Sequence, residues 1–116
     1  MWINPIFNRT QIDLNNKTDK AYFTYDDANR IEGNLCHLLD IENSTVYNRQ
    51  SSVYDFFESV LSKIEILLKK VWLYKPPNLK MSADYVNLNN IEKTIFQIKA
   101  SQDSIIYLDE IYTGEM

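Results

Sequence analysis

The stretch Asn29-Arg30-Ile31-Glu32-Gly33-Asn34-Leu35 returns sixty residues later as Asn89-Asn90-Ile91-Glu92-Lys93-Thr94-Ile95. Apolar residues within and around each stretch recur at the three- and four-residue spacing of a half-buried helix. The same offset keeps capping, polar and apolar positions in type: it pairs Thr24 with Asp84, Tyr25 with Tyr85, Asp27 with Asn87 and Leu38 with Ile98. The sequence therefore predicts two similar helices that face each other in a small module built to pack and bind.

Three amphipathic helices are expected from this spacing and from their capping residues. Their expected bounds are about Tyr25 to Ile41, about Ser52 to Leu73 and about Ala83 to Ser101. Pro76-Pro77 prevents the second helix from continuing, because a proline ring removes a backbone donor and clashes with the preceding turn. We predict an all-α fold, a small three-helix bundle, with the bundle domain over residues 24–102.

Both flanks of the bundle carry apolar residues. Residues 1–23 are expected to form an extended N-terminal arm, with one capped turn at Thr10-Gln11-Ile12-Asp13. The arm either lies across its own helices or docks on a neighbouring subunit, because exposed apolar patches mark contact sites. Residues 103–116 form a C-terminal extension whose β-branched and aromatic content is compatible with a strand, an extended arm or a further helical turn.

Composition narrows the class of protein. A hydrophobic fraction of 45% and a charged fraction of 24% are typical of a soluble globular domain. The net charge of −4 leaves no electrostatic footprint for nucleic acid, and two glycines leave little material for a phosphate-binding loop. The single cysteine and the lack of a leader or a long apolar run indicate synthesis in a reducing cytoplasm and no membrane insertion.

The residues that commonly carry catalysis do not converge in the sequence. Cys36 and His37 are neighbours on one helix and point about 100 degrees apart, so they cannot form a dyad. A single histidine cannot complete an ordinary zinc site, and adjacent acids such as Asp26 and Asp27 diverge from each other. We therefore expect no catalytic residue, no cofactor, no metal and no small-molecule substrate, and we expect that the protein is not an enzyme.

The repeated phrase suggests polar bracing. Asn29 and Glu32 lie three residues apart, and Arg30 and Asn34 lie four apart, so each pair shares a helix face. Side chains placed in this way can hold a loop, a chain terminus or a partner's backbone by hydrogen bonds. We favour bracing over direct partner contact, because local networks commonly hold a terminus in place. The bracing residues predicted are Asn29, Arg30, Glu32, Asn34, Asn89 and Glu92.

The first 40 residues also resemble a known module. Asn4-Pro5, then Arg9-Thr10-Gln11-x-Asp13, then Tyr25-x-Asp27-x-Asn29-Arg30-Ile31-Glu32-x-Asn34 and the end Leu38-Leu39 are similar to a small helical module of Firmicutes phage and prophage tail proteins. That module carries an RTQxD phrase followed, after a spacer, by DLNRIExN. This chain departs from it at Ala28, where leucine is common, and at Gly33, and no long fibre-like region follows. A short adaptor is therefore expected rather than a complete receptor-binding fibre.

The resemblance implies a structural role without enzymatic activity. It implies a component of the baseplate or of the tail-fibre attachment, in a virion or in a phage-derived contractile particle, made in the bacterial cytoplasm. The implied partners are other tail or baseplate proteins, with multiple copies in a symmetric assembly. The residues expected to contact partners are large and apolar or aromatic: Trp2, Ile3, Ile6, Phe7, Ile105, Ile106, Tyr107, Ile111 and Tyr112.

Two other classes of function stay open at this point. A small cytoplasmic helical regulator or a tail-assembly chaperone would hold one partner peptide in a groove between its helices. It would occur as a soluble monomer or dimer that never enters a particle. An enzyme is the second alternative, and an activity lost on changing His37 would support it.

Overall fold

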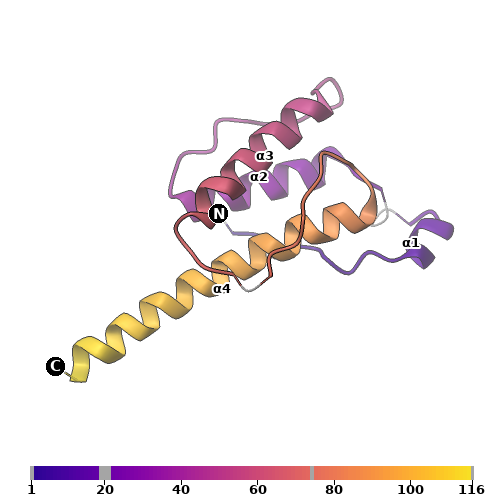
Figure 1. Cartoon of the computed structure of the whole chain (residues 1–116). Coiled ribbons are helices and arrows are strands. Elements are labelled where there is room, and N and C mark those ends of the chain that lie inside the picture. Colours follow the sequence, from indigo (N-terminus) through magenta and orange to yellow (C-terminus); the bar gives the residue numbers. More distant parts are fainter. Residues whose placement is uncertain (1, 19–21, 74, 116) are drawn as a thin grey trace.

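Three long helices pack against one another as a bundle. The computed structural model describes residues 2–18, 22–73 and 75–115, and their side chains as far as residue 103. A short helix, α1 (Gln11–Asn15), precedes α2 (Tyr25–Leu39), α3 (Val53–Leu68) and α4 (Tyr85–Glu115). Helices α2 and α3, α2 and α4, and α3 and α4 are in contact with each other, and Figure 1 shows α4 continuing beyond the bundle. No strand occurs in this described part, which confirms the all-α three-helix prediction.

Side-chain caps start the helices where the sequence predicts. Thr24 accepts the N–H of Asp27, whose carboxylate in turn accepts the Thr24 N–H, so α2 begins with a capping box. Thr10 and Asp13 form the same box at α1, which confirms the capped turn expected there. Helix α2 ends because Asp40 adopts the left-handed conformation, with φ of 56°, and directs its N–H to carbonyls of the last turn.

The predicted apolar stripes form one core. From α2 it takes Ala28, Ile31 and Leu35; from α3 Phe56, Phe57, Val60, Ile64 and Leu67; and from α4 Leu88, Ile91, Ile95 and Ile98. The four α4 residues are fully buried, at 0% exposure. Val53 is 52% exposed, since it is the first residue of α3 and borders an open pocket. Packing of the three stripes supplies most of the helical stability.

Two helix ends differ from the prediction. Helix α3 ends at Leu68 and not Leu73, because the N–H groups of Lys69 and Lys70 bond to carbonyls three residues back and tighten the last turn. The chain nevertheless stays on the core, where Val71 is 9% exposed. Helix α4 runs past Ser101 to Glu115, and an ion pair of 2.9 Å between Lys99 and Asp103 spans the expected boundary. Of the three conformations left open for the C-terminal extension, the structure thus has the helix.

The N-terminal arm lies across its own helices, which is the first of the two expected alternatives. Trp2 packs against the core, and the backbone of residues 3 to 9 bonds to side chains of α2 and α4. From here on the name arm is kept for residues 2–9, because α1 follows them and buries none of its residues. In the described residues we find no helix with the length and apolarity needed to cross a membrane.

Candidate functional site

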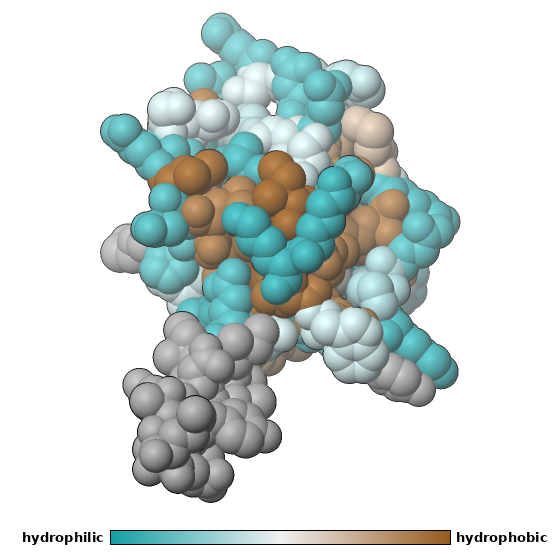
Figure 2. Space-filling model, turned by 60° about the vertical axis from the view of Figure 1, so that its left-hand side comes forward, coloured by the Kyte–Doolittle hydropathy of each residue, from teal (hydrophilic) through white to brown (hydrophobic). Residues whose placement is uncertain are grey.

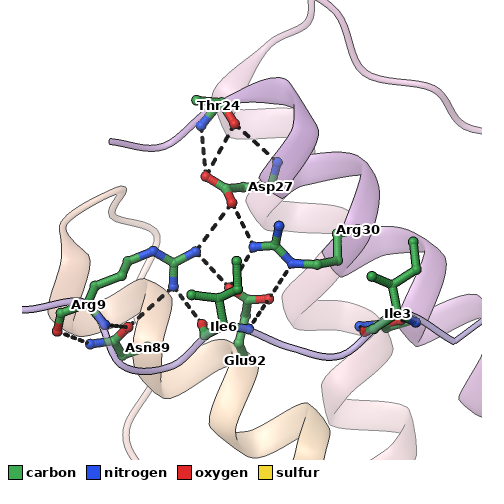
Figure 3. A network of polar contacts seen from close by, with 9 residues as sticks. Ile3, Ile6, Arg9, Thr24, Asp27, Arg30, Asn89 and Glu92 are labelled. Atoms are coloured by element: carbon green, nitrogen blue, oxygen red, sulfur yellow. Dashed lines mark hydrogen bonds and ion pairs between the residues drawn. The ribbon is translucent and has the colours of Figure 1, made fainter. Parts of the chain in front are cut away.

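Four charged side chains join the arm to the bundle. Arg9 comes from the arm, Asp27 and Arg30 from α2, and Glu92 from α4; we call them the charge quartet (Figure 3). Arg9 Nη2 lies 2.7 Å from Glu92 Oε2 and 3.4 Å from Asp27 Oδ1. Arg30 lies 2.8 Å from Glu92 through Nε and 2.6 Å from Asp27 through Nη2. Each carboxylate therefore meets both guanidinium groups.

The quartet is buried and electrically neutral. The side chains of Arg9 and Glu92 are fully buried, and those of Asp27 and Arg30 nearly so. Burial lowers the pKa of Arg30, but hydrogen bonds and charges from Glu92 and Asp27 outweigh it, so the net pKa is raised. Two positive and two negative groups offset one another's desolvation only while all four stay in place. The charge quartet therefore fixes one position of the arm on the bundle.

Asparagine side chains hold the arm backbone at two points. The N–H of Ile3 donates to Asn34 Oδ1 at 2.9 Å, while Asn34 Nδ2 donates to the Ile3 carbonyl at 2.7 Å. Asn89 makes the same pair of bonds with Arg9, at 3.1 Å and 2.8 Å. We call such a two-bond contact between an asparagine amide and one backbone residue an amide pair. It replaces the ladder bonds that an extended segment would find in a sheet.

The same contact holds two other irregular segments. Asn29 forms an amide pair with Tyr47, in the loop between α2 and α3, at 3.0 Å and 2.7 Å. Asn87 forms one with Lys80, before α4, at 2.8 Å and 2.7 Å. Asn29 and Asn89 are equivalent under the sixty-residue offset, so equivalent positions on α2 and α4 perform the same contact on different segments.

Glu32, the counterpart of Glu92 in the repeated phrase, also organises a polar cluster. Glu32 is fully buried and accepts hydrogen bonds from the Tyr47 hydroxyl at 2.7 Å and from Ser59 at 2.6 Å. Lys63 Nζ donates to Ser59 at 2.7 Å and lies 3.2 Å from Glu32 Oε2, although outside hydrogen-bond geometry. Burial raises the pKa of the Tyr47 hydroxyl, and its hydrogen bond to Glu32 raises this pKa further. This cluster ties the loop and α3 to α2.

All six predicted bracing residues lie in these contacts between segments. The sequence interpretation did not single out Arg9, Tyr47, Ser59, Lys63 and Asn87 as members of the network. Asn87 had a signal, since the offset pairs it with the capping residue Asp27. Ser59 and Lys63 also had one, as polar residues four apart beside the α3 stripe.

The predicted partner-contacting residues of the arm have mixed exposure. Ile3 and Phe7 are 47% and 38% exposed, whereas Trp2 and Ile6 are half-buried. The Trp2 ring lies 6.1 Å from that of His37, with Lys99 Nζ 5.3 Å from its centroid. In the C-terminal part of α4, the other predicted contacts have side chains outside the described residues: Ile105, Ile106, Tyr107, Ile111 and Tyr112.

The described residues offer places for apolar contact. An open cavity of about 280 Å³ lies between the starts of α2 and α3, with walls that include Phe23, Tyr47 and Phe56.

The groups that commonly carry catalysis are not activated or gathered in the described residues. Burial raises the pKa of the Cys36 thiol, and the negative charge of Glu32 raises it further, which disfavours the nucleophilic thiolate. Among the side chains described, no three histidine, cysteine or acidic groups are placed to hold a metal ion.

The fold and the site define a small helical module whose polar residues fix irregular segments onto a bundle. Comparison with models of protein families, with curated proteins and with solved structures found no match to this chain.

Proposed function

We propose that this protein is a structural component of a phage tail or a phage-derived contractile tail. It acts as an adaptor in the baseplate or at the tail-fibre attachment, where it holds neighbouring tail proteins together. The proposal assigns it no catalytic step, and it places the protein in the tail particle after synthesis in the bacterial cytoplasm.

One observation carries most of the proposal. The two phrases on which the resemblance to tail proteins depends are joined in space, because Arg9 of the first lies within ion-pair distance of Asp27 in the second. Within the first phrase, Thr10 and Asp13 cap α1, and within the second, Asn29, Arg30, Glu32 and Asn34 all brace other segments. The phrases thus encode one way of seating an arm on a bundle, which supports a structural role.

The surface supports the same role. Figure 2 shows apolar side chains grouped near the middle of one face and bordered by hydrophilic ones. Exposed apolar residues include Phe7 on the arm and Phe96 on α4, whose rings lie 5.5 Å apart. Such a pair offers a neighbouring protein an aromatic contact next to the seated arm.

Mass spectrometry of particles purified from induced cells of the source strain tests the proposal. We expect this chain at a fixed ratio to the tail components, and a Phe7→Ser variant is expected to be incorporated less than the wild type. Glu65→Gln, at an exposed position on α3, serves as the matched control. Recovery only from the soluble lysate would contradict a particle role.

The open cavity favours a second candidate, a tail-assembly chaperone. Its aromatic walls and volume of about 280 Å³ suit an apolar side chain from a partner peptide. This candidate predicts a soluble complex with one tail protein, and weaker binding of that protein by a Phe23→Ser variant. Equal binding by the wild type and by the variant would exclude the cavity as the site.

A further inference from the structure

The net charge of the chain belongs to the part of α4 that continues beyond the bundle. Residues 103–115, which we call the acidic end, contain no lysine or arginine and four acidic residues: Asp103, Asp109, Glu110 and Glu115. Residues 1–102 contain all 12 basic residues and the other 12 of the 16 acidic ones, so their formal charges cancel. The net charge of −4 is therefore concentrated on one projecting segment of helix.

The sequence of the acidic end also places apolar residues on one helix face. They are three or four positions apart, which is the spacing of an amphipathic helix: Ile105, Leu108, Ile111 and Tyr112. At a rise of 1.5 Å a residue, the acidic end extends α4 by about 20 Å. Figure 1 shows this part of α4 leading away from α2 and α3. Because packing of an apolar face supplies most of a helix's stability, the acidic end calls for a partner.

The segment that follows α3 has the opposite charge. Residues 69–80, which we call the basic segment, contain no acidic residue and four lysines, all of them exposed: Lys69, Lys70, Lys75 and Lys80. Between them Trp72 is 76% exposed, while Val71, Leu73 and Leu79 pack on the core and hold the segment on the bundle. A large exposed aromatic side chain among cations suits a partner that is both apolar and acidic.

We propose that the acidic end of α4 docks on the basic segment of a second copy of this chain. Each copy offers one acidic end and one basic segment, so two equivalent contacts close a dimer with a two-fold axis. The inference goes beyond the proposed tail role, because it concerns contact between two copies of the chain in solution.

Charge and geometry favour a second copy as the occupant. Four acidic residues meet four lysines in each contact, whereas two acidic ends placed side by side would bring like charges together. Within one chain, α4 is a continuous helix from Tyr85 to Glu115, and it leads the acidic end away from the bundle on which the basic segment lies (Figure 1). A second copy supplies a basic segment without a break in α4.

Charge reversal in the full-length chain tests the docking. One variant carries Asp109→Lys, Glu110→Lys and Glu115→Lys, and the other carries Lys69→Glu, Lys70→Glu and Lys80→Glu. Sedimentation equilibrium at low ionic strength should report a dimer for the wild type. Each variant alone should be a monomer, because its acidic end and its basic segment then carry charges of the same sign. An equimolar mixture of the two variants should form a dimer again, since in both contacts the signs are opposite.

The mixture also excludes misfolding as the cause of lost dimers, because misfolded chains would not recover on mixing. The control changes three exposed acidic residues outside both segments and matches the first variant in net charge: Glu42→Lys, Glu58→Lys and Glu65→Lys. It should remain a dimer. A wild type that stays monomeric up to millimolar concentration, or a mixture that stays monomeric, would overturn the proposal. Stronger dimers of the first variant alone would also overturn it, because they would show that the acidic ends pair with each other.

Trp72→Ser tests the apolar part of the contact. We expect it to raise the dissociation constant of the dimer at least about tenfold, because a tryptophan at the centre of an interface commonly carries much of the binding energy. Tyr54→Ser, at an aromatic residue of α3 that is 62% exposed, should leave the constant unchanged. Raising the salt concentration from about 50 mM to about 500 mM should weaken the wild-type dimer, since salt screens exposed charges. A dimer indifferent to both Trp72→Ser and salt would contradict the contact.

The outcomes separate this inference from the proposed function. A protein that is monomeric in these tests but occurs in particles at a fixed ratio loses the dimer contact and keeps its tail assignment. A protein whose charge-reversed variants recover the dimer on mixing but that is absent from particles loses the tail assignment and keeps the contact.

Discussion

At the scale of single residues, asparagine is the side chain that connects irregular segments to helices. Its primary amide places one donor beside one acceptor and so matches the N–H and C=O of a single backbone residue. Its side chain has few torsions, so ordering it costs less conformational entropy than ordering glutamine. The described residues form four such amide pairs: Asn29 with Tyr47, Asn34 with Ile3, Asn87 with Lys80, and Asn89 with Arg9.

Glu92→Gln tests the charge quartet. The substitution keeps the size of the side chain but removes one of the two carboxylates that the quartet places against Arg9 and Arg30. Because uncompensated buried charge is strongly destabilising, we expect the unfolding free energy to fall by about 3 kcal/mol. Urea unfolding measures this, and Glu65→Gln, at an exposed position, should change the value by less than about 0.5 kcal/mol. A similar effect of both variants would mean that the quartet adds nothing to stability.

Tyr47→Phe tests the Glu32 cluster through pH. The substitution removes a bond to a buried carboxylate and should cost about 2 kcal/mol near neutral pH. Since the folded-state pKa of Tyr47 is raised above its unfolded value of about 10, this contribution is complete below about pH 10 and is lost as pH rises through the folded pKa. Urea unfolding between about pH 8 and pH 11 should show a steeper loss for the wild type than for Tyr47→Phe. Tyr22→Phe, at an exposed tyrosine, should keep the wild-type slope.

At the scale of elements, α2 and α4 carry equivalent polar residues that bind different segments of the chain. Asn29 and Glu32 on α2 hold the loop before α3 and α3 itself, whereas Asn89 and Glu92 on α4 hold the arm. The two helices also meet directly through Arg30 and Glu92. A repeated helical pattern thus gives each helix an apolar face for the core and a polar edge that binds an irregular segment.

Asn89→Ala should loosen the arm without unfolding the bundle. It removes both bonds to the Arg9 backbone, so the Arg9 amide should lose most of its protection from hydrogen exchange. The amides of the buried α4 positions Ile91 and Ile95 should keep theirs. Amide exchange followed by NMR measures both, and Asn90→Ala, one residue along the same helix, is the matched control. Unchanged protection at Arg9 would show that the amide pair does not hold the arm.

Gly33→Ala should stabilise α2. An added Cβ would meet only the Asn43 side-chain nitrogen, at the ordinary contact distance of 3.7 Å. Alanine favours the helix over glycine by about 0.8 kcal/mol, so the thermal midpoint should rise by a few degrees. Calorimetry measures the midpoint. A lower midpoint would indicate that Gly33 is needed for close packing near the loop.

At the scale of the whole molecule, the arm is part of the fold that it crosses. Its contacts link the chain's first residues to α4 over sequence separations of 80 and more, and Trp2 covers the core. Among residues 10–22, by contrast, none of those that the structure describes is buried. The molecule therefore combines a tightly seated terminus with a following segment whose described residues are exposed or partly exposed.

Removal of residues 2–9 should destabilise the entire bundle. It deletes Arg9 from the quartet and uncovers core residues beneath Trp2, so we expect a loss of at least about 3 kcal/mol in unfolding free energy. Because the arm packs on the core, urea unfolding should remain a single transition at a lower midpoint. Ile12→Ser, at an exposed position of α1, should leave the midpoint unchanged. An unchanged midpoint after removal of the arm would show that arm and bundle are independent.

Much of the fold was predictable from the sequence because its signals are local. The apolar spacing of Ile31 and Leu35, or of Ile91 and Ile95, specifies a helix and its buried face within two turns. The caps at Thr24 and Thr10 act over three residues, and both were predicted. The end of α3 was predicted less well, because Val71 stays on the core after the helix has ended.

By itself, then, the sequence determined the helical class, the starts of the helices, their apolar faces and the polar edge that the repeat places on two of them. Only the tertiary structure decided what those edges hold. It brought Arg9 to Glu92 across 83 residues and Arg30 to Glu92 across 62, and it placed the Tyr47 hydroxyl on Glu32. The physical reason is that periodicity and capping act between near neighbours, whereas the partner of a buried charge or amide is selected only when distant segments pack together and bury it.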